Sequence, residues 1–323
     1  MQPFGNNASR LGTTRRVALG LSFGALTLPL LGKARAAAFP ERPIELIVPW
    51  GPGGGADQLG RKVAQLWEPL LQVSLPVINV PGASGVTGLA KMLAAPADGY
   101  SVSVITADTI GLQAEPGQSW RLEDIAPLGV LIQQTSFFFV GQESPFQSWA
   151  ELAAAAKERE LKVAITGFGT ADDQTVNYYR AKGLKLTAVP FAKPGERYAA
   201  VVGGNADLLY EQAGDVRSFL EAGQLKPVIH FATARGDFPD VPTATELGDP
   251  LTAKAYRGII IRADTPPEIT QKLIDTLREV AASADFKAYL AQQYAAADSA
   301  LFGTAANELI AAELAAAKQF AAN

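Results

Sequence analysis

The chain contains no cysteine and only one histidine, His230. The absence of cysteine excludes disulfide bonds, thiolate zinc sites, iron–sulfur clusters and cysteine nucleophiles. A single histidine excludes multi-histidine metal sites and leaves any histidine-based catalytic triad dependent on one residue. Because His230 lies in the apolar run 228–232, we interpret it as a hydrogen-bonded core residue and not as a catalytic base.

Positive charge is scarce after the first 38 residues. The chain has 28 Lys and Arg against 32 Asp and Glu, and five of the basic residues but none of the acidic ones lie within residues 1–38. The remainder therefore holds 23 basic residues against 32 acidic ones. A chain so acidic is a poor binder of nucleic acid or of anionic membranes. With 48% hydrophobic residues in 323, it can bury the core of about two domains.

The apolar segment near the start is too short to span a bilayer. Residues 17–32 form an uncharged run of 16 residues, whereas a spanning helix needs about 20. A basic start precedes the run and two A-x-A sites follow it, which is typical of a secretory signal. Residues 14–19 resemble a twin-arginine export signal, with an ordinary secretion signal as the alternative. We expect residues 1–38 to be removed by cleavage near Ala36 or Ala38, leaving a periplasmic protein.

Short β-branched segments alternate with segments of helical periodicity from residue 39 onward. This alternation predicts an α/β fold with mainly parallel sheets flanked by helices. Two such series predict two lobes, the first formed by residues 39–138 and 252–323 and the second by residues 139–251. The predicted strands cover residues 44–48, 77–80, 101–105, 161–165, 186–189, 206–210, 227–231 and 259–261.

Capping patterns predict where three helices begin. Residues 148–151 read Ser-Trp-Ala-Glu, a capping box that opens a helix through Lys157. Residues 265–268 read Thr-Pro-Pro-Glu, a second capping box with proline at the first helical position. The Ala-rich residues 304–320 predict a third helix by propensity alone.

Three glycine-rich loops each connect a predicted strand to a predicted helix, at residues 48–57, 79–88 and 166–170. Glycine lets the backbone approach a ligand closely, and the N–H groups at a helix N-terminus favour anions. Ligands of open α/β sheets bind at the carboxyl ends of the parallel strands. The loops therefore predict a cleft between two lobes that binds a small anion.

The first loop also fits a dinucleotide fingerprint. Gly51, Gly53 and Ala56 match G-x-G-x-x-A, and Glu68 would be the acid that binds the ribose. Against this, Asp57 would place a carboxylate close to the pyrophosphate, and Glu68 lies within a helical pattern instead of at the end of a strand. An exported nicotinamide-dependent oxidoreductase is therefore the less favoured interpretation.

Seven short motifs occur in a fixed order along the chain. Residues 39–44 read FPERPI and residues 238–243 read FPDVPT; the others lie at residues 48–57, 79–88, 96–101, 189–191 and 203–207. In this order they resemble the motifs of the extracytoplasmic solute-binding proteins of tripartite tricarboxylate transporters, the TctC or Bug family. The resemblance spans essentially the whole chain after residue 38.

The resemblance implies a two-lobed periplasmic-binding-protein fold, called a Venus flytrap, with crossing hinge strands. It implies a monomer without enzymatic activity, cofactor or metal, which binds one small organic acid and delivers it to a membrane permease. A sensor that docks on a membrane receptor is a further interpretation. The implied ligand-binding residues are Trp50, Gly53, Gly54, Gly55, Asp57, Ala83, Ser84, Gly85 and Thr106 in the first lobe, and Gly167, Phe168, Gly169, Thr170, Asp172, Asp173 and Glu211 in the second.

The chain departs from the family pattern by being more acidic around the cleft. Asp172 and Asp173 stand in a loop that usually carries small and hydroxyl residues, and Glu211 stands where the family often has Asp. Asp172 and Asp173 either occupy the first turn of a helix, where the helix dipole favours acids, or join Glu211 in pairing with a ligand cation.

Other cleft residues leave the ligand class open. Trp50 and Phe168 would suit an aromatic acid stacked between rings, although both could simply wall the hinge. Arg257 would either balance the acids or hold a second carboxylate. A dicarboxylate, an aromatic acid and an amino acid all remain candidate ligands.

Overall fold

The computed structural model describes residues 39–321, so the predicted export signal lies outside the described residues. Within this range one mixed sheet has the order β2-β1-β3-β9-β4-β7-β5-β6, with β8 paired to β4. Its strands are β1 (Glu45–Val48), β2 (Val77–Asn79), β3 (Ser101–Thr106), β4 (Ile125–Gly141), β5 (Leu161–Ile165), β6 (Leu186–Pro190), β7 (Leu208–Gln212), β8 (Leu225–His230) and β9 (Lys254–Arg262).

The sheet is parallel at its two ends and antiparallel in between. β1 pairs in parallel with β2 and β3, and β5 pairs in parallel with β6 and β7. Every antiparallel pairing among the described residues involves β4 or β9. The eight predicted strands are confirmed, although residues 259–261 are only part of the longer β9, and β4 was not predicted.

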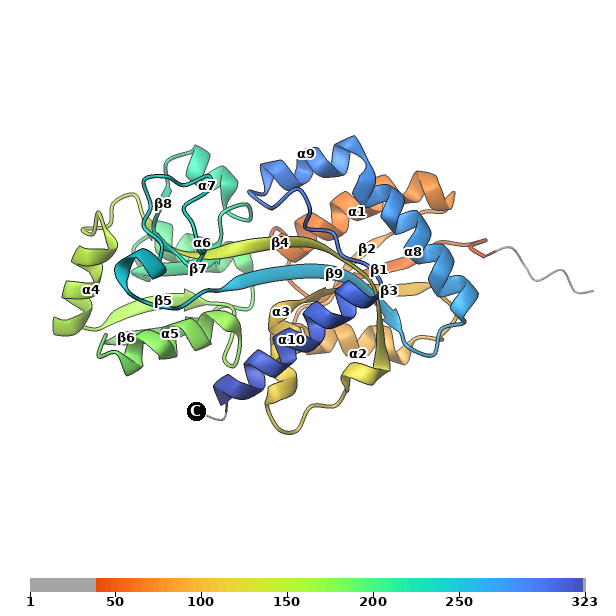
Figure 1. Ribbon diagram of the computed structural model, residues 1–323, viewed down its shortest axis with the longest axis horizontal. Coiled ribbons are helices and arrows are strands. Elements are labelled where there is room, and N and C mark those ends of the chain that lie inside the picture. Colours follow the sequence, from red (N-terminus) through yellow and green to blue (C-terminus); the bar gives the residue numbers. More distant parts are fainter. Residues whose placement is uncertain (1–38, 322–323) are drawn as a thin grey trace, which may run out of the picture. The chain divides into compact units, whose positions relative to one another are not determined.

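β4 and β9 connect the two ends of the sheet. The first part of β4 pairs with β9, from Ile125 to Thr135, and its last part pairs with β7 and β8, from Ser136 to Gly141. In Figure 1 these two long strands run side by side, with β1–β3 toward one end and β5–β8 toward the other. They are the crossing strands that the family resemblance implied.

Helices pack around both ends and enclose separate hydrophobic cores. One core gathers residues of β1, β3, α1 and α8, and another gathers residues of β5, β7, β8 and α5. The helices are α1 (Gly55–Leu71), α2 (Val86–Ala94), α3 (Ala107–Gly111), α4 (Trp149–Glu158), α5 (Ala171–Ala181), α6 (Pro194–Val202), α7 (Arg217–Glu221), α8 (Pro267–Ala282), α9 (Ala284–Gln292) and α10 (Thr304–Ala321).

The capping predictions had different outcomes. Ser148 is the N-cap of α4 and accepts a hydrogen bond from Glu151 N–H at 3.3 Å, as predicted. The prediction for α8 is wrong in its cap: Pro266 is the N-cap, and the buried Thr265 hydroxyl makes no hydrogen bond within the described residues. Pro267 suits the first position of α8 because its φ is fixed near the helical value and its missing N–H would have had no partner within the helix.

Replacing Ser148 by alanine is expected to lower the free energy of unfolding by about 1 kcal/mol, because an N–H group at the start of α4 loses its acceptor. Urea titration followed by circular dichroism measures the change. Ser218→Ala in α7 is the matched control, since no hydrogen bond from the Ser218 hydroxyl exists among the described contacts. Equal effects of the two substitutions would contradict the capping role.

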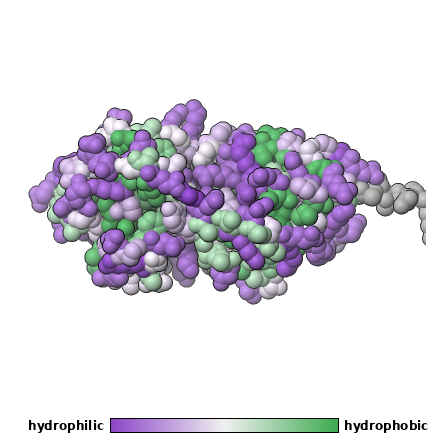
Figure 2. Space-filling view, turned by 90° about the horizontal axis from the view of Figure 1, so that it is seen from above, coloured by the Kyte–Doolittle hydropathy of each residue, from purple (hydrophilic) through white to green (hydrophobic). Residues whose placement is uncertain are grey.

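Hydrophilic side chains dominate the face shown in Figure 2, and hydrophobic ones appear in separate groups. Large hydrophobic side chains that are exposed within residues 39–319 are few: Leu70, Phe168 and Leu247. No helix in the described part of the chain combines the length and the apolar character that crossing a bilayer requires.

Candidate functional site

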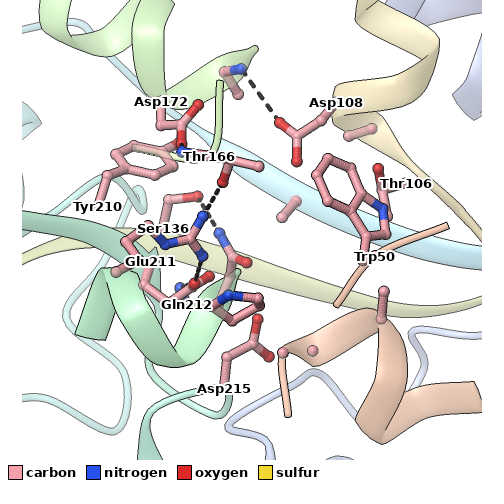
Figure 3. A pocket seen from close by; sticks show the side chains of 18 of the residues that line it. Trp50, Thr106, Asp108, Ser136, Thr166, Asp172, Tyr210, Glu211, Gln212 and Asp215 are labelled. Atoms are coloured by element: carbon pink, nitrogen blue, oxygen red, sulfur yellow. Dashed lines mark hydrogen bonds and ion pairs between the residues drawn. The ribbon is translucent and has the colours of Figure 1, made fainter. Parts of the chain in front are cut away.

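A cavity lies where the carboxyl ends of the parallel strands from both ends of the sheet face one another. It encloses about 660 Å³ of space, including part of the open solvent. Figure 3 shows Trp50, Thr106 and Asp108 on one side and Asp172, Tyr210 and Glu211 on the other. The lining residues are Trp50, Gly54, Gly55, Ala56, Thr106, Ala107, Asp108, Ser136, Thr166, Ala171, Asp172, Phe191, Ala192, Pro194, Arg197, Tyr210, Glu211, Gln212, Asp215, Ala255 and Arg257.

Both terminal nitrogens of the Arg257 guanidinium group are engaged by protein partners. It bonds both oxygens of Asp215, at 3.2 and 2.5 Å, and donates to Gln134 and Gln212 at 2.6 Å each. Arg257 is 7% exposed and Asp215 is 5% exposed, so the pair is buried. The sequence left two roles open for Arg257, balancing the acids of the cleft or holding a second ligand carboxylate. This geometry favours the first role.

Arg197, on α6, is engaged in a second buried ion pair. It donates to Glu211 and to the Thr166 hydroxyl. Glu211 also accepts from Tyr198 Oη at 2.9 Å and from Gln212 N–H at 3.1 Å. Burial opposes ionisation of Glu211, but Arg197 and Arg257 hold its pKa below the usual value. Glu211 is therefore an ionised partner of protein cations.

Asp108 and Asp172 are the two lining acids that form no ion pair. Burial, together with the neighbouring Asp172, raises the pKa of Asp108 to about 7. Burial also raises the pKa of Asp172, against the opposing effect of Arg197. The lining thus contains four carboxyl groups and only two guanidinium groups. When all are ionised, the cavity has an excess of negative charge.

Backbone donors of the loop before α5 are already occupied by acids of this chain. Asp172 accepts from Thr166 N–H and Asp173 N–H, and Asp173 accepts from Gly169 N–H at 3.0 Å. Asp108 accepts from Ala171 N–H at 3.3 Å, across the cavity. The dipole of α5 thus favours these carboxylates, as one sequence interpretation held. A ligand carboxylate would have to displace one of them.

Donors toward the β1 side remain without protein acceptors. The indole Nε1 of Trp50 is buried and has no hydrogen-bond partner within the described residues. Gly55 and Ala56 begin the 17-residue helix α1 and line the cavity. A helix N-terminus with unpaired N–H groups favours an anion. This side of the cavity is the better place for a carboxylate.

Four close approaches join the two sides of the cavity. A Cβ added at Gly54 would lie 2.6 Å from Pro194 Cγ, and one at Gly167 would lie 2.5 Å from Ser84 Oγ. A Cβ added at Gly55 would lie 2.2 Å from Asp215 Oδ2. The fourth approach is the hydrogen bond from Ala171 N–H to Asp108. Glycine at these positions permits contact between the two sides.

The structure brings part of the predicted site to the cavity and leaves part outside its lining. The predicted residues in the lining are Trp50, Gly54, Gly55, Thr106, Asp172 and Glu211. The predicted residues outside it are Gly53, Asp57, Ala83, Ser84, Gly85, Gly167, Phe168, Gly169, Thr170 and Asp173.

Asp57 holds the first glycine loop together instead of lining the cavity. It accepts hydrogen bonds from Gly53 N–H at 3.0 Å, from Arg61 Nε at 2.9 Å and from Asn79 Nδ2 at 2.9 Å. Burial opposes ionisation, but these hydrogen bonds hold the pKa of Asp57 below its usual value. Its carboxylate stabilises the turn that presents Gly54 and Gly55.

The second and third glycine loops shape the mouth of the cavity. Ala83 and Ser84 adopt left-handed φ angles of 47° and 49°, which are unfavourable for residues with a Cβ. Ser84 lies against Gly167 of the opposite loop, and Phe168 is 63% exposed. The glycines in these loops mark the geometry of turns, not the lining.

Sequence reasoning missed Asp108, Arg197 and Asp215. Asp108 lies two residues after Thr106, which itself follows the predicted strand 101–105. Ligand contacts are expected at this end of a strand. Arg197 resembles an ordinary surface residue of an amphipathic helix, so no sequence signal marks it. Asp215 follows β7 by three residues and could have been found by the same strand-end rule.

The alternatives drawn from the sequence receive little support. Glu68 accepts a hydrogen bond from Leu75 N–H at 2.7 Å and does not line the cavity, so it is not placed to bind a ribose there. His230 is buried and stacks on Phe137 with ring centroids 5.0 Å apart. Burial lowers the pKa of His230. Within residues 39–321 no group of three or more His, Asp or Glu side chains is arranged to hold a metal ion.

Comparisons with known proteins agree with this architecture. A TctC solute-binding protein from Polaromonas has 28% sequence identity and a TM-score of 0.63 over 88% of this chain and 99% of its own. MatC from Rhodopseudomonas palustris with bound malate has 24% identity and a TM-score of 0.79 over 87% of this chain and 99% of its own. A UPF0065 protein from the TAR-I ttuE-ttuC′ intergenic region of Agrobacterium vitis is 29% identical over 79% of this chain and 75% of its own.

The fold of these solved structures is that of periplasmic binding proteins, which confirms the predicted fold class. The family described as "Tripartite tricarboxylate transporter family receptor", or TctC, matches residues 60–318 of the chain. The expected family is thereby confirmed, and the chain belongs to the TctC family of tripartite tricarboxylate transporter receptors.

Proposed function

We propose that this protein is a periplasmic receptor that captures a small organic carboxylate in the cavity and delivers it to the membrane permease of a tripartite transporter. The observation that carries the proposal is the position of the cavity, between strand ends from both ends of the sheet and against β4 and β9. Malate bound to MatC, a protein of the same fold, supports a carboxylate ligand.

Binding without catalysis is part of the proposal. The relatives of this chain are solute-binding proteins, and the cavity has no nucleophile–base arrangement among its described residues. Both guanidinium groups in the lining are paired with acids of the chain, which suits recognition and positioning. Bending of β4 and β9 would open and close the cavity around the ligand, as in hinge closure.

Native mass spectrometry of residues 39–323 purified from the periplasm tests this function. We expect an adduct with the mass of a small acid that is lost on denaturation. A thermal-shift screen of carboxylates gives a second readout, since a ligand at 100 times its dissociation constant adds ~2.7 kcal/mol of stability. An adduct of dinucleotide mass, or failure of every carboxylate in the screen, would overturn the proposal.

A further inference from the structure

We infer that the ligand carries a protonated amino group in addition to its carboxylate, and that Asp108 binds this ammonium while Asp172 supplies further negative charge. The inference rests on the proposed function of the cavity and narrows the ligand class to zwitterionic amino acids. It is supported by the arrangement of charged groups and hydrogen-bond donors on the two sides of the cavity.

The first argument is the pairing of charges. Arg257 is bonded to Asp215, and Arg197 is bonded to Glu211. No lysine or histidine lines the cavity. A ligand with two carboxylates would therefore add two negative charges to a lining whose positive groups are already neutralised, and burial makes such excess charge costly.

The second argument is the open side of Asp108. Its Oδ1 accepts from Ala171 N–H, while Oδ2 has no partner among residues 39–321. Figure 3 shows this carboxylate pointing into the cavity beside Trp50 and Thr106. An ammonium group there would give Asp108 the cation that Asp215 and Glu211 already have.

The third argument is that Thr106 offers an acceptor and not a donor. Thr109 Oγ1 donates its proton to Ser84 O at 3.1 Å, so in the 3.2 Å contact between Thr109 and Thr106 the donor is Thr106. A hydroxyl has only one proton, so none is left for a ligand carboxylate. The remaining lone pair of Thr106 suits an N–H donor.

Three lining side chains each have a buried polar atom without a protein partner: Trp50, Arg197 and Tyr210. Trp50 Nε1 is available to donate to the ligand carboxylate, next to the first N–H groups of α1. The Tyr210 side chain is 5% exposed, and its hydroxyl lies near Ser136 and Thr175 without a hydrogen bond of good geometry to either. The third such atom is Arg197 Nε, which neither Glu211 nor Thr166 accepts from, and all three atoms belong to residues that line the cavity.

Titration calorimetry with size-matched ligands tests the inference. Aspartate is compared with succinate, and leucine with 4-methylpentanoate; each pair differs in the presence of an ammonium group. We expect the amino acid of at least one pair to bind and its partner without the amino group to bind at least about 30-fold more weakly, as for loss of one buried charge partner. Asp108→Asn should remove that difference, whereas Glu115→Gln, which changes an exposed acid outside the lining, should keep it.

The pH dependence of binding has opposite signs under the two ligand classes. Asp108 faces Ala171 N–H, Asp172 on α5, Glu211 on β7 and Arg257 on β9. Its ionised form binds a cation, so affinity for an amino acid should rise from pH 6 to pH 8 by up to about tenfold per unit below the pKa. Affinity for a plain carboxylate should fall over the same range. Asp215 titrates in this range too, so only a slope that Asp108→Asn flattens belongs to Asp108.

Each outcome decides between the two proposals. Binding of amino acids with the stated dependence on Asp108 supports the inference. Equal or tighter binding of succinate or 4-methylpentanoate, or unchanged amino acid binding by Asp108→Asn, overturns it and leaves the receptor function standing. Failure of all four ligands and of every other carboxylate or amino acid tried overturns both.

Discussion

Replacing Arg257 by methionine is expected to lower the free energy of unfolding by about 3–5 kcal/mol. The substitution leaves the buried Asp215 carboxylate without its cation and removes donors from Gln134 and Gln212. Urea unfolding followed by circular dichroism measures the loss. A comparison with Arg217→Met, which breaks the exposed Arg217–Glu221 pair, should show a change within about 0.5 kcal/mol.

The defect of Arg257→Met should also depend on pH. Burial already raises the pKa of Asp215 to about 7 beside Arg257, and removal of the cation raises it further. The unfolded chain keeps the ordinary value of about 4, so the folded state binds more protons between the two values. Stability of the variant therefore falls as pH rises through this window, and the defect is larger at pH 8 than at pH 5.

A double substitution controls for lost packing. Arg257→Met combined with Asp215→Asn removes both charges, and we expect it to recover much of the loss because an uncharged pair has no uncompensated charge to bury. We expect the added Asp215→Asn substitution to restore stability at pH 8 and to change it little at pH 5. A single variant that loses less than 1 kcal/mol at pH 8 would show that the ion pair is not buried as the structure describes.

Replacing Gly55 by alanine is expected to weaken binding of the tightest ligand in the amino acid panel by about 10- to 100-fold, on the scale of overpacking a closed site. The added Cβ would lie 2.2 Å from Asp215 Oδ2 and 2.5 Å from Arg257 Cζ. Because the pair is held by several hydrogen bonds, it cannot turn aside without breaking them. The methyl group therefore pushes α1 away from Asp215, which follows β7, and from Arg257 on β9.

Titration calorimetry measures the affinity of Gly55→Ala, and small-angle scattering measures its radius of gyration with saturating ligand. We expect weaker binding and a larger radius than for the unsubstituted protein. Gly195→Ala is the matched control, since no atom lies within 4 Å of a Cβ added there on α6. An unchanged dissociation constant in Gly55→Ala would show that the lobes bind ligand without this close approach.

Periodicity predicted the parallel ends of the sheet but not β4. The strands at each end have β-branched residues between turn signals, which is the usual pattern. The side chains of β4 are shared among four hydrophobic clusters, two on its first part and two on its last part. Pro127, Gly129 and Gln133–Gln134 interrupt any alternation. A strand whose side chains are divided among several cores has no single period to detect.

Lining residues of the candidate site were predictable from the sequence where they belong to a single continuous loop or strand end. The loop at residues 48–57 was placed next to the cavity from its glycines and its position between strand and helix. The ion pairs were not, because Arg197 on α6 meets Glu211 on β7, and Arg257 on β9 meets Asp215 after β7. No spacing in the sequence relates these residues, because the first pair forms where α6 packs against β7 and the second forms across the β9-β4-β7 part of the sheet.

The contacts that the protein makes with itself across the cavity bear on kinetics as well as affinity. Ser84 against Gly167, Gly54 against Pro194 and Ala171 against Asp108 separate only when the two sides move apart, whichever solute is inside. The rate of that opening sets a common upper limit on how fast any solute reaches Asp108. Discrimination between solutes then lies in their residence times: solutes enter the cavity at similar rates, and the preferred ligand is the one that dissociates most slowly.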